Sequence, residues 1–174
     1  ELRVMRFGDN MREVAVTEGD KVDAQIKFGW QVNTWPVGYL VEEMNGVSEA
    51  DIDEKMARYR EKYELDCDDL DAVRYQARLE IAMGRVFERE GVGAFSNTFQ
   101  DLYGLRQLPG LATQNLMAAG YGFAAEGDWK TAALTAVVKK MTCGMTGGTT
   151  FIEDYTYNME EGNAYSLGAH MLEV

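Results

Sequence analysis

The sequence predicts an α/β protein in which a three-layer domain with a parallel sheet, residues 1–146, precedes the start of a β-rich domain, residues 147–174. Segments with the spacing of strands alternate with segments of helical spacing up to about residue 140, an order typical of a parallel sheet covered by helices. After a glycine-rich break at residues 143–148, two strand-like segments follow each other directly. Consecutive strands joined by a tight turn are antiparallel, so the architecture changes at this break.

The first elements are a strand and a helix. Residues 2–7 have the composition of a strand, and the turn Gly8-Asp9 follows them. Val22 and Ile26 stand at helical spacing within residues 17–28, which predicts a helix there. The order of elements around this helix stays open.

Two long helices follow with clear signals. Ser48 is an N-cap residue with Asp51 three residues later, and the helix behind it carries the apolar stripe Ile52, Met56, Tyr59 and Tyr63. The longest helix is expected over residues 68–90, with Gly91 ending it. Its inward face is Ala72, Tyr75, Leu79, Ala82, Met83 and Val86.

The second half of the domain repeats the alternation. A strand over residues 94–99 precedes a helix that Pro109 opens, and residues 121–125 form a short apolar strand. Asp128 caps the last helix, whose inward face is expected to be Leu134, Val137, Val138 and Met141. This order of elements fits a flavodoxin-like or Rossmann-like domain.

The segment beyond the break predicts two antiparallel strands, residues 149–158 and 164–172, around a turn at residues 160–163. The chain starts within a strand and stops in an apolar stretch, whereas natural termini usually fray through polar residues. We therefore expect an excised piece of a longer protein.

Composition excludes several classes of function. The net charge of −12 argues against nucleic acid or an anionic membrane as a partner. No apolar run approaches the roughly 20 residues of a transmembrane helix. Cys67 and Cys143 make no disulfide framework, which favours a reducing compartment such as the cytoplasm.

Candidate site residues lie where the predicted strands end, because ligands of open parallel sheets bind beyond the carboxyl ends of the strands. Met5 or Phe7, Phe99 and Glu126 occupy these ends. Glu126 directly follows an apolar strand and precedes a helix. The alternative for Glu126 is a capping or solvated acid without a role in chemistry.

A second group lies beyond the break. The period of two along a strand places four residues on one face: Phe151, Glu153, Tyr155 and Tyr157. An acid among aromatic residues suggests that this face lines a polar cavity. The alternative is an edge strand whose face is partly exposed to solvent. His170 is the only histidine of the sequence, and it is either a metal ligand or a residue with a structural role. Two glutamates and a histidine would suit a divalent ion such as Mn²⁺.

The other motifs indicate no further site. The glycines of residues 144–148 form neither a dinucleotide-binding fingerprint nor a P-loop, so a hinge between domains is the better interpretation. The acidic residues around Glu49 and Asp69 are interpreted as solvated helix starts and faces without EF-hand spacing.

Four strings of residues carry a resemblance that covers essentially the whole chain. They are FGDNMREVAVT at residues 7–17, EGDWKTA at 126–132, FIEDYTY at 151–157 and GAHMLEV at 168–174. With them the chain resembles the bacterial L-arabinose isomerase family. The resemblance implies a central α/β domain followed by the first strands of a C-terminal β-barrel.

The resemblance also implies site residues and a function. Glu126, Glu153 and His170 would be three of four Mn²⁺ ligands, with a second histidine far downstream, and Met5, Phe99 and Tyr155 would contact the sugar. The parent would be a homo-hexamer in which the N-terminal domain of a neighbouring subunit completes the pocket.

Such an enzyme would interconvert L-arabinose and L-ribulose, and plausibly D-galactose and D-tagatose, by metal-assisted proton transfer through an enediol. Glu126 and Glu153 would act as the proton-shuttling pair. The isolated chain would be inactive. The alternative is a non-catalytic α/β module that serves folding or assembly.

Overall fold

The computed structural model describes residues 1–168. Its central sheet has four strands in the order β2-β1-β3-β4, and every neighbouring pair is parallel. The strands are β1 (Arg3–Phe7), β2 (Gln31–Trp35), β3 (Ala94–Asn97) and β4 (Gly122–Ala124). The predicted parallel sheet is therefore confirmed.

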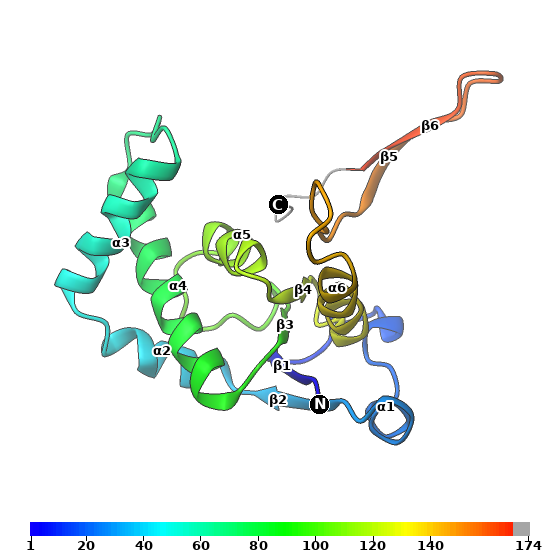
Figure 1. Ribbon diagram of the computed structural model, residues 1–174, viewed down its shortest axis with the longest axis horizontal. Coiled ribbons are helices and arrows are strands. Elements are labelled where there is room, and N and C mark those ends of the chain that lie inside the picture. Colours follow the sequence, from blue (N-terminus) through cyan, green and yellow to red (C-terminus); the bar gives the residue numbers. More distant parts are fainter. Residues whose placement is uncertain (169–174) are drawn as a thin grey trace.

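Helices cover both faces of the sheet and make it the middle of three layers (Figure 1). One face carries α1 (Lys21–Phe28) and α6 (Trp129–Met141), and a short 3-10 helix, η1 (Ala15–Thr17), precedes α1. The other face carries α2 (Val37–Asn45), α4 (Leu70–Glu90) and α5 (Gly110–Ala118), with α3 (Glu49–Lys62) packed on the outside of α4. None of the helices within residues 1–168 is long and apolar enough to cross a membrane.

The two long helices confirm the capping signals of the sequence. Ser48 and Asp51 form a reciprocal capping box at the start of α3. Gly91 ends α4 with φ +64°, a left-handed conformation that glycine adopts without steric cost. The core forms where Phe87 of α4 meets Phe95 of β3, with ring centroids 4.8 Å apart.

The sequence pattern does not predict β2 or α2. Strand β2 lies at an edge of the sheet and leaves Asn33 and Thr34 exposed, so it lacks a clear alternation of buried and exposed residues. Helix α2 begins directly after Pro36. The helix has nine residues, and its buried residues Val37, Leu40 and Met44 span only about two turns, which is too short for the helical periodicity to be clear in the sequence.

The predicted inward face of α6 is wrong. Leu134 and Met141 are 55% and 77% exposed, and Val137 and Val138 are only partly buried, whereas Trp129, Ala132, Ala133 and Thr135 are buried. The reason is close packing on β4. A Cβ atom on Gly122 would lie 2.6 Å from the Cβ of Ala136 and closer still to the carbonyl oxygen of Ala132. Only small residues fit this contact, so the large apolar side chains face outward.

Helix α1 forms within the predicted range, but it hardly uses its apolar residues. Val22 and Ile26 are exposed, and within the helix only Ala24 is buried. Because Lys21, Gln25 and Lys27 surround these residues, hydropathy alone does not separate the packed face from the solvent face.

The two strands beyond the break form an antiparallel hairpin, as predicted. They are β5 (Asp154–Asn158) and β6 (Tyr165–Gly168), and their turn is closed by a hydrogen bond of 3.0 Å from Asn163 N to Glu160 O. The hairpin extends away from the sheet and helices (Figure 1). Residues 169–172 of the second predicted strand lie outside the described part of the chain.

The expected face running from Phe151 to Tyr157 is not regular. Strand β5 begins only at Asp154, and its register shifts between Asp154 and Thr156. Phe151 lies before the strand and is buried against Phe123 of β4, with ring centroids 5.9 Å apart. Phe151 therefore belongs to the core of the first domain, and the strand with its alternation of side chains begins only after it.

We expect Gly122→Ala to destabilise the chain by about 1–3 kcal/mol or more, because the added methyl group overlaps backbone and side-chain atoms of α6. Urea unfolding followed by circular dichroism measures the change. Gly84→Ala is the control, since Gly84 lies inside α4 with no atom within 4 Å of an added Cβ. That control should stabilise the chain by about 0.5–1 kcal/mol. Equal stabilities of the two variants would contradict the close contact of α6 with β4.

We expect the amides of β5 and β6 to exchange with solvent much faster than those of β1 and β3. Within residues 1–168 the hairpin strands pair only with each other, whereas β1 and β3 lie inside the four-stranded sheet. Two-stranded ribbons open with little cost in free energy. Amide hydrogen exchange followed by mass spectrometry tests this, and uniform protection across the four strands would count against it.

Candidate active site

The carboxyl ends of the four parallel strands lie at one edge of the sheet. Three loops leave this edge next to one another: residues 8–13 after β1, 98–101 after β3 and 125–128 after β4. The chain runs from β1 outward to β2 and then crosses to β3 on the other side of β1, so the direction of winding changes between β1 and β3. Ligands of open α/β sheets bind at such a switch point.

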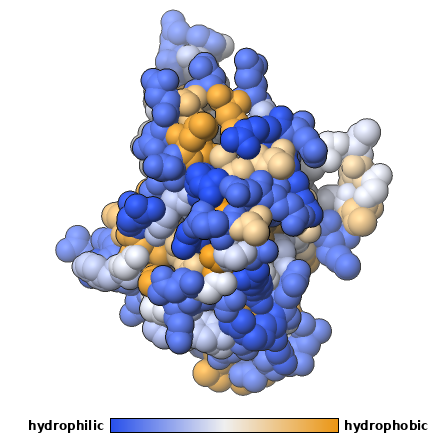
Figure 2. All heavy atoms as spheres, turned by 90° about the vertical axis from the view of Figure 1, so that its left-hand side faces the viewer, coloured by the Kyte–Doolittle hydropathy of each residue, from blue (hydrophilic) through white to orange (hydrophobic). Residues whose placement is uncertain are grey.

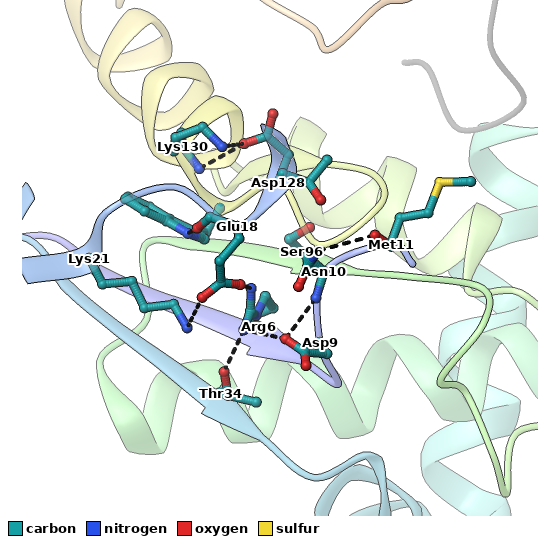
Figure 3. Close-up of polar contacts among 12 residues, drawn as sticks. Arg6, Asp9, Asn10, Met11, Glu18, Lys21, Thr34, Ser96, Asp128 and Lys130 are labelled. Atoms are coloured by element: carbon teal, nitrogen blue, oxygen red, sulfur yellow. Dashed lines mark hydrogen bonds and ion pairs between the residues drawn. The ribbon is translucent and has the colours of Figure 1, made fainter. Parts of the chain in front are cut away.

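A buried arginine lies under this edge (Figure 3). Arg6 of β1 is 2% exposed. Its Nη1 donates to the Glu18 carboxylate over 2.5 Å, and its Nη2 donates to Asp9 over 2.7 Å and to the Thr34 hydroxyl over 3.1 Å. The guanidinium of Arg6 lowers the pKa of Glu18, so this carboxylate stays charged at neutral pH. Burial of a charge is tolerated only with such partners.

Asp101 joins the loop after β1 to the loop after β3. Its Oδ2 accepts the backbone N–H of Asp9 over 2.9 Å, and its Oδ1 accepts Arg12 Nη1 over 2.7 Å. Arg12 N also donates to the Gln100 side chain over 2.7 Å. The Arg12 guanidinium and the N–H of Asp9 hold the pKa of Asp101 below its usual range. These contacts fix the two loops that flank the switch point.

Glu126 lies in the loop after β4 with an unusual backbone. Its φ is +62°, and a side chain in this left-handed region costs about 1–2 kcal/mol. Its carbonyl oxygen accepts the N–H of Met11 over 2.9 Å. The helix cap is supplied by Asp128, which accepts the N–H groups of Lys130 and Thr131. Asp128 thus fills the capping role considered as the alternative for Glu126, and the Glu126 side chain is partly exposed at the strand edge.

Glu153 lies on a segment that contacts the same part of the sheet. It follows Phe151, whose ring packs on Phe123 of β4, and Glu126 follows the same strand. Thr149 accepts a hydrogen bond of 2.5 Å from Lys139 of α6, so the segment before β5 is attached at two points. The side chain of Glu153 is partly buried.

The remaining predicted site residues have different positions. Met5 is a core residue of β1 with 1% exposure, and Phe99 is 55% exposed in the loop after β3. Tyr155 lies within β5. His170 lies outside the described residues. Residues 1–168 contain no group of three or more histidine, cysteine, aspartate or glutamate side chains that could hold a metal ion.

A separate cleft of about 480 Å³ lies between α2, α3 and α4 and contains none of the predicted site residues. Figure 2 views the molecule from this side, where hydrophilic residues cover most of the surface and hydrophobic residues show between them. Glu49 at the cleft pairs with Arg74 and Arg78 over 2.6 and 2.5 Å. This acidic helix start, interpreted from sequence as solvated, is therefore exposed but ion-paired.

Sequence reasoning did not identify Arg6, Asp9 or Asp101. Arg6 carried a signal, because a charged residue inside the apolar run of β1 requires partners if both faces of the sheet are covered. Asp9 and Asp101 are acids in loops, and nothing in their spacing shows that they meet.

Comparison with known proteins agrees with this architecture. A family model described as the L-arabinose isomerase central domain matches residues 3–144, and the model of the L-arabinose isomerase C-terminal domain matches residues 148–174. The domain boundary expected between residues 146 and 147 lies between these two ranges.

Curated relatives are similar over the entire chain. The L-arabinose isomerase of Salmonella enteritidis is 57% identical over 180 aligned residues, and that of Salmonella typhimurium is 56% identical over the same length. In both cases the alignment covers 100% of this chain and 36% of the relative, so the chain spans about a third of the length of these proteins. Since the central-domain model alone matches most of the chain, this protein belongs to the L-arabinose isomerase family.

Proposed function

We propose that this chain is part of an aldose-ketose isomerase that interconverts L-arabinose and L-ribulose, with D-galactose and D-tagatose as a second pair. The observation that carries the proposal is the 57% identity to a curated L-arabinose isomerase over the whole chain. The position of Glu126 at the carboxyl edge of the sheet supports it. The complete protein would be a cytoplasmic homo-hexamer.

The reaction moves a proton between C2 and C1 of the sugar through an enediol. It needs a base, an acid and stabilisation of the negative charge that develops on the sugar oxygens. Glu126 and Glu153 supply the two carboxyl groups of this proton shuttle.

The donor chemistry fits Mn²⁺ as the cofactor. Carboxylate oxygens of Glu126 and Glu153 with the imidazole of His170 suit a hard to borderline divalent ion, whereas the exposed Cys67 and Cys143 offer no thiolate site. When bound, Mn²⁺ would stabilise negative charge on the O1 and O2 oxygens of the sugar. A fourth ligand would come from a histidine further along the parent chain.

Other residues of this chain would shape the sugar pocket. Phe99 presents an exposed aromatic ring beside the switch point, where it can cover the apolar face of a sugar and exclude water. Met5 and Tyr155 are the other proposed contacts. Since Met5 is buried in β1, it would support the pocket from below by packing and would not bind the sugar through a polar group.

We expect Glu126→Gln and Glu153→Gln each to lower kcat of the full-length enzyme by about 10²- to 10⁴-fold. An amide keeps the size of the side chain but cannot accept a proton, so catalysis suffers more than sugar binding. Ketose formation at saturating Mn²⁺ measures this. Glu61→Gln is the control, because Glu61 is exposed on α3 and should leave turnover unchanged. Near-normal turnover of both Glu126→Gln and Glu153→Gln would remove these carboxylates from the mechanism.

We expect the 174-residue chain to bind Mn²⁺ at least roughly tenfold more weakly than the full-length protein and to show no isomerisation. One proposed ligand is outside this chain, and ordering of the segment around Glu153 opposes binding. Titration calorimetry of both proteins tests this. A tight site in the chain that Glu126→Gln does not weaken would contradict the ligand assignment.

A further inference from the structure

The backbone of Glu126 depends on contacts from a neighbouring loop. Its carbonyl oxygen accepts the N–H of Met11 over 2.9 Å. The next residue, Gly127, packs so closely on the same loop that an added Cβ would lie 2.7 Å from the Cα of Asn10. Since Glu126 has φ +62°, which its side chain disfavours, these contacts determine how the residue is held.

Asp101 holds that loop through both of its carboxylate oxygens. One carboxylate oxygen accepts Asp9 N over 2.9 Å and the other accepts Arg12 Nη1 over 2.7 Å, so both ends of the loop attach to one side chain. The Asp101 side chain is only 18% exposed. Gly8 leaves room for it, because an added Cβ there would lie 2.6 Å from the Cβ of Asp101.

We propose that Asp101 is a positioning residue for Glu126, acting through the loop of residues 8–12 and the hydrogen bond from Met11 to Glu126. The inference rests on the proposed function of Glu126. Without the Asp101 carboxylate, Asp9 N–H and the Arg12 guanidinium lose their shared acceptor. The loop then keeps the contact of the Asp9 side chain with Arg6 and the hydrogen bonds from Arg12 to Gln100. The loop then moves, and Glu126 moves with it.

A matched control exists in α3. Asp51 accepts a backbone N–H from Ser48 over 3.3 Å and Nη2 of Arg85 over 2.9 Å, so it combines the same two kinds of donor as Asp101. Helix α3 carries no residue of the proposed site. Asp51→Ala therefore reproduces the loss of an ion pair and a backbone hydrogen bond without acting on Glu126.

The first measurement is amide hydrogen exchange of Met11 by NMR in the 174-residue chain. We expect Asp101→Ala to lower the protection of this amide by about tenfold or more, because the hydrogen bond to Glu126 opens more often. In Asp51→Ala the protection of Met11 should equal that of the unmodified chain. This readout does not depend on metal or activity.

The second measurement uses the full-length protein with Mn²⁺. We expect Asp101→Ala to lower both kcat and the affinity for Mn²⁺ by about 10- to 100-fold, with the KM for L-arabinose changed by less than about threefold. Asp101→Asn keeps an oxygen acceptor for Asp9 N–H but loses the ion pair with Arg12, so its kcat should lie between those of Asp101→Ala and the unmodified enzyme. Asp51→Ala should match the unmodified enzyme in both quantities.

The outcomes separate this inference from the proposed function. If Asp101→Ala equals Asp51→Ala in Met11 exchange, kcat and Mn²⁺ affinity, the inference is overturned even when Glu126→Gln is inactive. Normal turnover of Glu126→Gln would overturn the proposed function and this inference together. If Asp101→Ala does not fold, Arg12→Ala removes the ion pair with Asp101 by changing an exposed residue instead. Unchanged kcat and unchanged Met11 exchange in Arg12→Ala would equally overturn the inference.

Discussion

The buried guanidinium of Arg6 constrains the whole carboxyl edge of the sheet. A charge with 2% exposure on the central strand requires anionic partners, and the chain supplies Asp9 from the loop after β1 and Glu18 from the segment after η1. These two ion pairs bring the connection between β1 and α1 back over the strand ends. The indole N–H of Trp129 donates to the carbonyl of Glu18, which ties α6 to the same connection.

Close contacts at two glycines complete this arrangement. Gly122 lets α6 rest directly on β4, and Gly127 lets the loop after β4 touch the backbone of Asp9 and Asn10. Glu126 lies between these two contacts, with its backbone conformation determined on both sides. Such a rigid backbone would suit the proton transfer proposed for Glu126, because catalysis is sensitive to misplacement by fractions of an ångström.

Local signals predicted the parallel sheet, three of its four strands and the long helices, whereas β2 and the packing of the elements depend on tertiary contacts. Ser48, Asp51 and Gly91 act through their own backbone, so their roles in α3 and α4 follow from the sequence. The orientation of α6 depends on Gly122 in another element, and for that reason its apolar periodicity predicted the wrong face. The position of Glu126 after a strand could be predicted because it is a local property, whereas its contact with Met11 and the contacts of Asp101 depend on loops that are distant in sequence.

The hairpin of β5 and β6 has a consequence for the behaviour of this chain in solution. Within residues 1–168 its outer edges have no partner strand, and Tyr157, Tyr165 and Leu167 are all more than half exposed. Such edges pair with copies of themselves, while a net charge of −12 keeps the copies apart. At 0.1 M salt the Debye length falls to about 10 Å and this repulsion weakens. Salt therefore favours self-association through the edges of the hairpin, and low ionic strength opposes it.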